Sequence, residues 1–151
     1  MLRMSKLTDY GTMVLAQLAV SDHGWTTASQ VAGATHLGQP TVSKLLKALV
    51  HARLVTSTRG VQGGYALARP AATISAAEIL DALEGPVAIT ECSSSKGGCE
   101  LESFCLVGTA WQRINHSIRK ALEGVSLADL QQRREQLPNL RTEVRTAALA
   151  R

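Results

Sequence analysis

The chain has 151 residues, of which 45% are hydrophobic and 3% aromatic, with a formal net charge of +4. This length suits one domain of ordinary size, or a small domain with an appendage, and its core must be mostly aliphatic. No stretch approaches the ~20 apolar residues of a membrane helix, and the N-terminus lacks the apolar run of a signal peptide, so we expect a cytoplasmic protein with reduced thiols.

The positive charge lies in the N-terminal half. Residues 1–70 carry seven Lys or Arg against two acids, giving +5, whereas residues 71–151 carry nine bases against ten acids, giving −1. A basic surface is often only solvated, but this half is the candidate for contact with a polyanion.

Three helices are predicted in the first 52 residues. The first spans about residues 6–20, because apolar side chains recur at helical spacing on one stripe, namely Leu7, Tyr10, Val14 and Leu18. The second covers 28–35, behind an N-cap at Thr26 or Thr27. A turn that pivots at Gly38 leads to the third, which begins at Pro40 and buries Val42, Leu45, Leu46 and Leu49.

A β-hairpin is predicted next. Residues 54–58 and 65–68 are short β-type runs, and the glycine-rich stretch RGVQGG joins them. Short helices with a tight turn, followed by a hairpin, make a winged helix-turn-helix, which ends at Pro70. The predicted fold class is therefore mainly α with a small β-hairpin wing and a long dimerisation helix.

The remaining helices lie beyond Pro70. A capping box of Ser75 and Glu78 opens one over 75–85, and a long helix follows at about 109–123. Its apolar stripe could pack onto its own domain, but we predict a dimer contact, because a stripe that protrudes from a small domain must be buried somewhere. That stripe consists of Trp111, Ile114, Ile118 and Leu122.

These patterns divide the chain into five parts. They are a DNA-binding domain (1–70), a connecting helix (71–90), a cysteine loop (91–108), a dimerisation region (109–134, with a weaker helix from 126) and a flexible tail (135–151).

The helix that begins at Pro40 is the candidate recognition helix. Its first turn would enter the major groove, where base edges carry a distinct donor and acceptor pattern. Gln39, Thr41 and Lys44 are placed to read bases or neighbouring phosphates. Ser43 and Lys47 are placed to contact the DNA backbone.

The wing carries one cation, Arg59, among small residues. It could be a simple surface charge, but an arginine on a slim hairpin tip suits a narrow minor groove, where negative potential concentrates. Because a helix-turn-helix precedes it, we predict that Arg59 contacts DNA.

All the thiols lie in ECSSSKGGCELESFC, residues 91–105, with the spacing C-x6-C-x5-C at Cys92, Cys99 and Cys105. Zinc loops usually pair cysteines at C-x2–4-C, whereas wider gaps with Ser and Gly can wrap an iron–sulfur cluster. Unligated thiols would suit an apolar core better than this polar loop. A zinc- or thiol-based sensor stays open, and no Cys-His-Asn arrangement indicates an enzyme.

A cluster normally has four protein ligands, so a residue other than cysteine must complete this one. Glu91 and Glu100 each adjoin a cysteine, which is a strained way to share one cluster. Glu102 and His116 are less constrained. Asp9, in the first turn of the first helix, can equally be an acid that the helix dipole favours.

Taken together, MSKLTDYG, TVSKLLKALVHARLV, RGVQGGYALARP and the triple cysteine loop resemble the Rrf-two family of bacterial iron–sulfur transcription regulators, over about residues 1–130. Its start, MLRMSKLTDYG, is most similar to the branch that regulates the SUF cluster-assembly operon. The resemblance implies a homodimer crossed through the long helix, a palindromic operator, and a 2Fe–2S or 4Fe–4S cluster on the three cysteines that sets DNA affinity.

Two departures from the Isc regulator of this family bear on the ligands. The first cysteine gap is six residues here and five there, and its histidine three positions after the last cysteine is replaced by Gly108. In the family's nitric-oxide-sensitive repressor, an aspartate of a similar Thr-Asp stretch completes the cluster from the partner subunit. The resemblance therefore implies that Asp9 of one subunit serves the cysteines of the other.

The expected function is that of a redox-sensing repressor of SUF cluster-assembly genes, and not of an enzyme. A nitric oxide sensor on the same scaffold is one alternative. A redox protein that binds a cluster or zinc without any DNA function is another.

Overall fold

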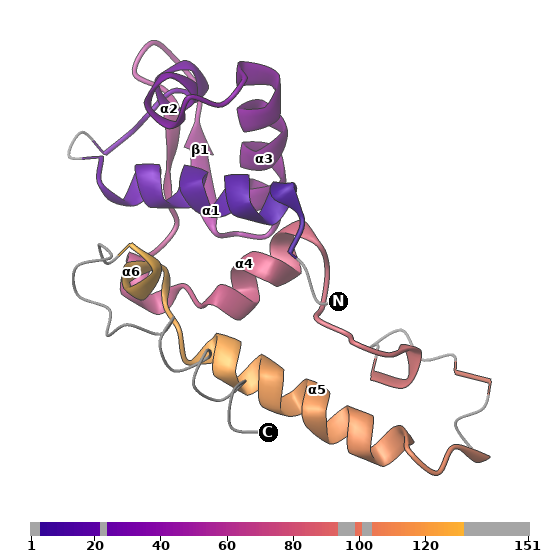
Figure 1. Ribbon diagram of the computed structural model, residues 1–151. Helices are drawn as coiled ribbons and strands as arrows, with labels where there is room; N and C mark the ends of the chain where they lie inside the picture. The colour runs from indigo at the N-terminus through magenta and orange to yellow at the C-terminus, as the bar shows by residue number, and fades with distance from the viewer. Residues whose placement is uncertain (1–3, 22–23, 94–98, 101–103, 132–151) are drawn as a thin grey trace, which may run out of the picture.

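The computed structural model describes residues 4–21, 24–93, 99–100 and 104–131 (Figure 1). The chain folds mainly into helices with one two-stranded hairpin, so the predicted fold class is confirmed. The elements in chain order are α1 (Lys6–Ala19), α2 (Ala28–Thr35), α3 (Gln39–His51), β1 (Val55–Thr58), β2 (Gly64–Leu67), η1 (Ala71–Thr73), α4 (Ala76–Leu83), η2 (Glu91–Ser93), α5 (Gly108–Glu123) and α6 (Leu127–Leu130).

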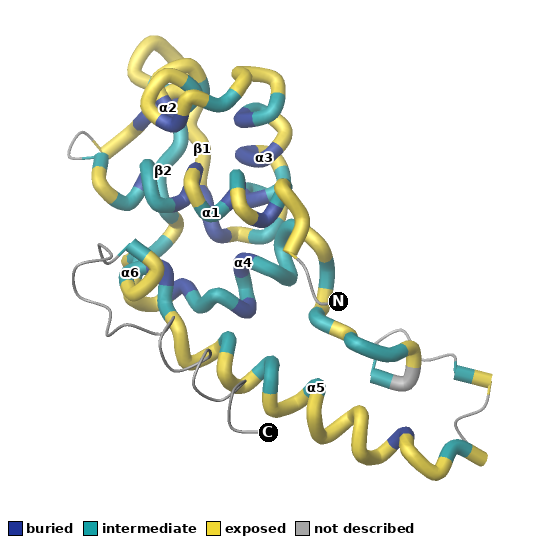
Figure 2. Tube along the Cα trace, in the orientation of Figure 1, coloured by how far each residue is buried: buried dark blue, intermediate teal, exposed yellow. Residues whose placement is uncertain are grey.

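An aliphatic core lies where α1, α2 and α3 face one another (Figure 2). The predicted stripe of α3 is fully buried, as its helical spacing requires. On α1, Val14 and Leu18 are buried as predicted, whereas Leu7 and Tyr10 only pack against the edge of the core. The core side of α1 is therefore wider than the predicted stripe, since it also includes Leu15.

The turn between α2 and α3 differs from the prediction. Thr27 caps α2 and forms a capping box with Gln30, but the residue that turns the chain is His36, which has φ 57°. Gly38 has φ −60° and precedes the first residue of α3, so it is not the pivot. Pro40 lies in the first turn of α3, where its missing N–H leaves no hydrogen bond unmade.

The hairpin is held against the helices by a contact that no sequence pattern predicts. β1 and β2 pair antiparallel from Val55 with Leu67 to Thr58 with Gly64. Beside this pair, Thr26 and Tyr65 exchange backbone hydrogen bonds of 2.9 and 2.8 Å. A Cβ at position 64 would lie 2.9 Å from the Thr26 carbonyl oxygen, so glycine is required at this close approach.

α5 extends away from the core, and α6 after it returns the chain to the core. Leu127 of α6 is fully buried, and its N–H donates to the carbonyl of Ile74 at 2.7 Å. α5 lies against α4, where the Arg119 guanidinium donates two hydrogen bonds to the Asp81 carboxylate, at 2.8 and 3.1 Å. The N-terminal half of α5 protrudes beyond the compact part of the chain (Figure 1).

Two sequence predictions fall partly or wholly beyond these residues. The helix expected from residue 126 begins at Leu127 and is described to Leu130, and the tail expected over 135–151 lies outside the described residues. In the part of the chain that the structure describes, no helix is both long enough and apolar enough to cross a bilayer.

Candidate DNA-binding face and cysteine loop

The first turn of α3 and the tip of the wing lie at the same end of the molecule, opposite α5 (Figure 1). The core contacts of α3 fix which of its side chains remain outside. Of the predicted contact residues, Gln39, Lys44 and Lys47 are exposed, while Thr41 and Ser43 are half-buried. The structure thus places both predicted DNA elements on one face.

Arg59 is exposed at the tip of the wing, directly after β1. It lines a depression of about 500 Å³ between the hairpin and the start of α2, together with residues such as Thr27, Ser57 and Thr58. The guanidinium of Arg59 therefore lies near hydroxyl groups and backbone atoms. Such a site suits contact with a DNA backbone phosphate or with the edge of a groove.

The chain leaves its compact part after α4, and the cysteine loop then leads to the start of α5, at the protruding end of this helix. Cys92 lies in η2, which packs beside α5. Cys99 and Cys105 are half-buried and form no disulfide. Val107, the N-cap of α5, makes no side-chain hydrogen bond to the first N–H groups of this helix, and the positive end of the helix dipole favours a negatively charged group near Cys105.

Gly108, the first residue of α5, lies beside the last cysteine. A Cβ at this position would be 3.5 Å from Cys105 Sγ, which is ordinary contact. A side chain here would therefore reach any group bound by that sulfur. Since glycine has no such side chain, position 108 supplies no ligand beside Cys105.

Asp9 is exposed and lines a depression of about 560 Å³ with Met4, Ser5 and Lys6. Among the described residues, no three His, Cys, Asp or Glu side chains are close enough to hold a metal ion. The structure of one chain therefore does not bring Asp9 together with Cys99 and Cys105.

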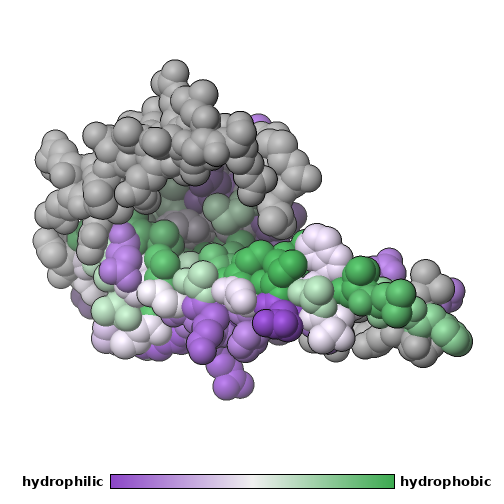
Figure 3. Space-filling model, turned by 60° about the horizontal axis from the view of Figure 1, so that its bottom comes forward, coloured by the Kyte–Doolittle hydropathy of each residue, from purple (hydrophilic) through white to green (hydrophobic). Residues whose placement is uncertain are grey.

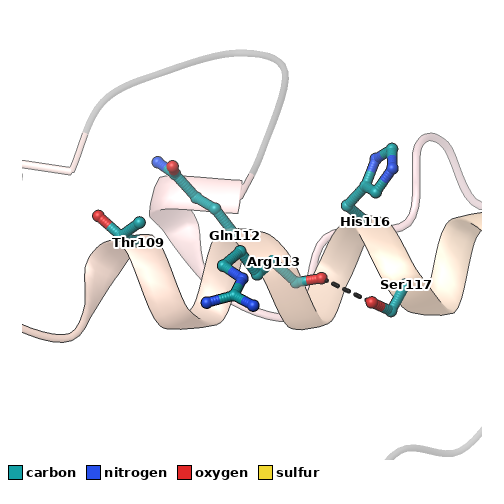
Figure 4. Close-up of a pocket in the computed structure, with 5 residues that line it drawn as sticks. All are labelled: Thr109, Gln112, Arg113, His116 and Ser117. Atoms are coloured by element: carbon teal, nitrogen blue, oxygen red, sulfur yellow. Dashed lines mark hydrogen bonds between the residues drawn. The ribbon is translucent and has the colours of Figure 1, made fainter.

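The other candidate ligands that the structure describes form no metal-binding group either. Glu91 and Glu100 are exposed, and Glu102 lies outside the described residues. His116 is exposed on α5, in a shallow depression of about 330 Å³ whose other lining residues are Thr109, Gln112, Arg113 and Ser117 (Figure 4). His116 and Gln112 project from the same side of the helix, so this histidine belongs to a polar face of α5.

Two side chains that the sequence did not single out hold the segment between α4 and η2. Glu84, directly after α4, accepts hydrogen bonds from Ser5 and Thr8 at the start of α1. Asn115 of α5 binds the backbone of Val87 and Ile89, with its amide nitrogen 3.1 Å from the first carbonyl and its oxygen 3.2 Å from the second N–H. The only sequence signal was a polar residue beside the apolar stripe of α5.

Comparison with known proteins identifies the family. A family model described as an iron-dependent transcriptional regulator, Rrf2, matches residues 4–133. A protein of Azotobacter vinelandii named as an HTH-type transcriptional regulator, ORF2, is 32% identical over 130 residues, which cover 85% of this chain and 79% of that protein.

Two solved structures share the fold over most of their length. CymR, titled the global cysteine regulator of B. subtilis, has a TM-score of 0.68 and 28% identity, covering 87% of this chain and 97% of its own. IscR of T. potens has a TM-score of 0.66 and 27% identity, covering 94% and 96%. The chain belongs to the Rrf2 family of DNA-binding transcriptional regulators.

Proposed function

We propose that this protein is a dimeric, cytoplasmic repressor of SUF cluster-assembly genes, and that an iron–sulfur cluster sets its affinity for operator DNA. The observation that carries this proposal is the position of the thiols. All of them lie in one polar loop between the DNA-binding half and the protruding helix α5. The similarity to IscR and the description of the family model as iron-dependent support it.

The residues of the loop fit a cluster. Cys99 and Cys105 are unpaired and partly accessible, and the uncapped start of α5 favours negative charge beside them. When bound, a cluster supplies a group whose charge and ligands change with oxidation or iron loss. Cys92, Cys99 and Cys105 would hold it, while Asn115 keeps the chain that leads to Cys92 against α5.

Asp9 of the partner subunit is our candidate for the remaining ligand. Gly108 leaves the position beside Cys105 without a side chain, and Asp9 is exposed in an open depression. Because Asp9 does not reach the cysteines of its own chain among the described residues, a ligand role requires a second copy. A carboxylate donates less strongly than a thiolate, so it would exchange more easily.

The proposed dimer forms through α5. Apolar side chains follow this helix in a band (Figure 3), and four of them are exposed, Trp111 by 40% and Ile114 by 44% of their surface, with Val107 and Val125 before and after them. An exposed apolar band on a protruding helix favours a partner surface of the same kind. The α5 helix of a second copy offers such a surface, because a two-fold interface uses the same patch on both subunits.

The dimer provides the link between the two sites. Its two α3 helices must enter half-sites about one helical turn apart, and the crossing of the α5 helices sets their separation. The cysteine loop lies between these elements in the chain. A change in the order of this loop can therefore alter DNA affinity through a coupling free energy of about 1–3 kcal/mol, the usual size of such effects.

Arg59 and Lys47 are expected to act differently on DNA. Arg59→Ala should weaken operator binding by roughly 1–3 kcal/mol and relax shape preference, because it reads a groove. Lys47→Ala should weaken all DNA binding alike and lower the salt slope by about one unit, because it neutralises a phosphate. Titrations of operator and non-specific duplexes at several salt concentrations measure both effects.

The control for this pair is Arg113→Ala, which removes an exposed arginine from α5, at the opposite end of the molecule. It should leave both titrations unchanged. Equal effects of Arg59→Ala and Lys47→Ala on the two kinds of DNA would show that these roles are wrongly assigned.

Asp9→Ala is expected to leave the dimer folded, to change the absorption spectrum of the bound cluster and to shorten its lifetime. The physical reason is that one iron loses its protein ligand. Lys6→Ala, which alters the same depression, should change neither property. Absorbance and circular dichroism of the anaerobically reconstituted protein, followed during chelator challenge, provide the measurement.

A rescue variant makes this test sharper. Since a side chain at position 108 would lie beside Cys105, Gly108→His in the Asp9→Ala background should restore cluster lifetime with a nitrogen-ligated spectrum. If Asp9→Ala has the wild-type spectrum and lifetime, Asp9 is not the ligand, and Glu102 and His116 become the next positions to test.

The similarity to CymR favours a second candidate function, a regulator of cysteine supply that responds through its thiols without a cluster. Anaerobic purification with iron and sulfide analysis and Mössbauer spectra separates the two. Stoichiometric iron and sulfide support the cluster regulator, whereas their absence in a protein that binds DNA supports the thiol regulator. Nitric oxide sensitivity at physiological dose would indicate the related nitric oxide sensor.

A further inference from the structure

The start of α1 is tied to the end of α4 by one carboxylate. The Ser5 N–H donates to Glu84 Oε1 at 3.0 Å, and the Thr8 hydroxyl donates to the same oxygen. The hydrogen bond from Thr8, followed by those from Ser5, lowers the pKa of Glu84. The carboxylate is therefore charged at neutral pH. Glu84 therefore holds the turn that carries Asp9.

Packing next to this carboxylate keeps the two helices close. Thr8 is 3% exposed, although it is polar. One turn later, a Cβ at Gly11 would overlap the side chain of Leu83 at the end of α4. The Leu83 side chain therefore packs directly on the backbone of α1, next to the turn whose Ser5 and Thr8 bind Glu84.

The same carboxylate lies at the start of the segment that leads to the cysteine loop, which we call the root of the loop (residues 85–90). Residues 85–90 lead from Glu84 to η2, which contains Cys92, and Asn115 holds this segment on α5 at Val87 and Ile89. The segment is therefore fixed at one end to α1 and along its length to α5.

We propose that Glu84 is a positioning residue that holds the Asp9 turn and the root of the cysteine loop in one fixed relation. This inference rests on the proposed function, in which Asp9 and the cysteines serve clusters. With Asp9 reaching across the dimer, each chain contributes the loop of one site and the last ligand of the other. Glu84 then links the two sites, so loosening it weakens cluster retention without removing any ligand.

The first measurement uses the cluster-free, full-length protein. Glu84→Ala should accelerate hydrogen exchange at the amides of residues 5–8, 85 and 87–90 by about tenfold, as expected when local hydrogen bonds open more readily. Glu84→Gln keeps an acceptor oxygen and should show a smaller change. Asp129→Ala is the matched control. Like Glu84, Asp129 accepts one hydrogen bond from a backbone N–H and one from a hydroxyl, in its case both from Ser126 at the start of α6.

The second measurement is cluster lifetime under chelator challenge in the reconstituted dimer. Glu84→Ala should shorten it several-fold, Glu84→Gln should largely restore it, and Asp129→Ala should match wild type. A lifetime that does not depend on Glu84, or unchanged exchange at residues 85–90, would overturn this inference alone. A wild-type protein that takes up no cluster would overturn the proposed function and this role together.

Discussion

Replacing any one of Cys92, Cys99 and Cys105 by alanine is expected to abolish the stable visible absorbance of the reconstituted protein. A cluster normally requires four protein ligands, mostly thiolates, and each substitution leaves too few. The dimer should persist, because its proposed contact surface on α5 does not include the thiols. Absorbance, iron and sulfide content, and sedimentation of each variant measure the two expectations separately.

Ser93→Ala is the control for these variants. It removes the side chain next to Cys92 in the chain without removing a sulfur. The hydroxyl of Ser93 lies 2.8 Å from that of Thr90. Its cluster content should equal that of wild type. If the variant lacking all three thiols still holds iron and sulfide in stoichiometric amounts, the loop is not the binding site.

Ile114→Asp is expected to convert the dimer into a monomer. Ile114 lies in the middle of the exposed apolar band of α5, and a two-fold interface would bury one new carboxylate from each chain. An unpaired buried charge costs about 3–5 kcal/mol, so the dissociation constant should rise by at least about a hundredfold. Sedimentation velocity over a range of protein concentrations measures this change.

His116→Asp is the matched variant for this test, since it places the same carboxylate on the polar face of α5 (Figure 4). It should remain dimeric. Circular dichroism of both variants checks that the helices are retained. A dimer of unchanged affinity in Ile114→Asp would show that α5 does not form the subunit contact.

The sequence predicted the local structure well because local structure has local causes. The stripe of α3 and the capping box of Ser75 and Glu78 each involve residues a few positions apart, and both are present in the structure. The error at the turn before α3 has a similar origin. The prediction places the pivot of this turn at Gly38, but His36 is the residue that adopts the left-handed conformation, as non-glycine residues occasionally do.

Contacts between distant parts of the chain were beyond prediction. The bridge between Thr26 and Tyr65 and the bonds of Glu84 to Ser5 and Thr8 join residues separated by tens of positions, and no spacing rule connects them. The candidate site shows the same limit. Its three thiols are visible in the sequence, but the residue that we propose as the remaining ligand comes from a second chain, which one sequence does not place.

The proposed role of the loop in regulation rests on its position rather than on its composition. It begins at a segment held on α1 and α5 and ends at the first residue of the proposed dimer helix. In the proposed dimer, binding at the loop would thus act on the elements that set the separation of the two α3 helices. Family membership establishes DNA binding, whereas this coupling is the part that remains to be measured.

The most direct measurement compares operator affinity of the same preparation with and without its cluster. The operator is selected from a random duplex library by both forms, and affinity is measured anaerobically at fixed salt, because phosphate contacts make it salt-dependent. We expect the two forms to differ by roughly 5–150-fold, with the difference abolished in Cys105→Ala. Equal affinity of the two forms for every selected operator would contradict regulation by a cluster.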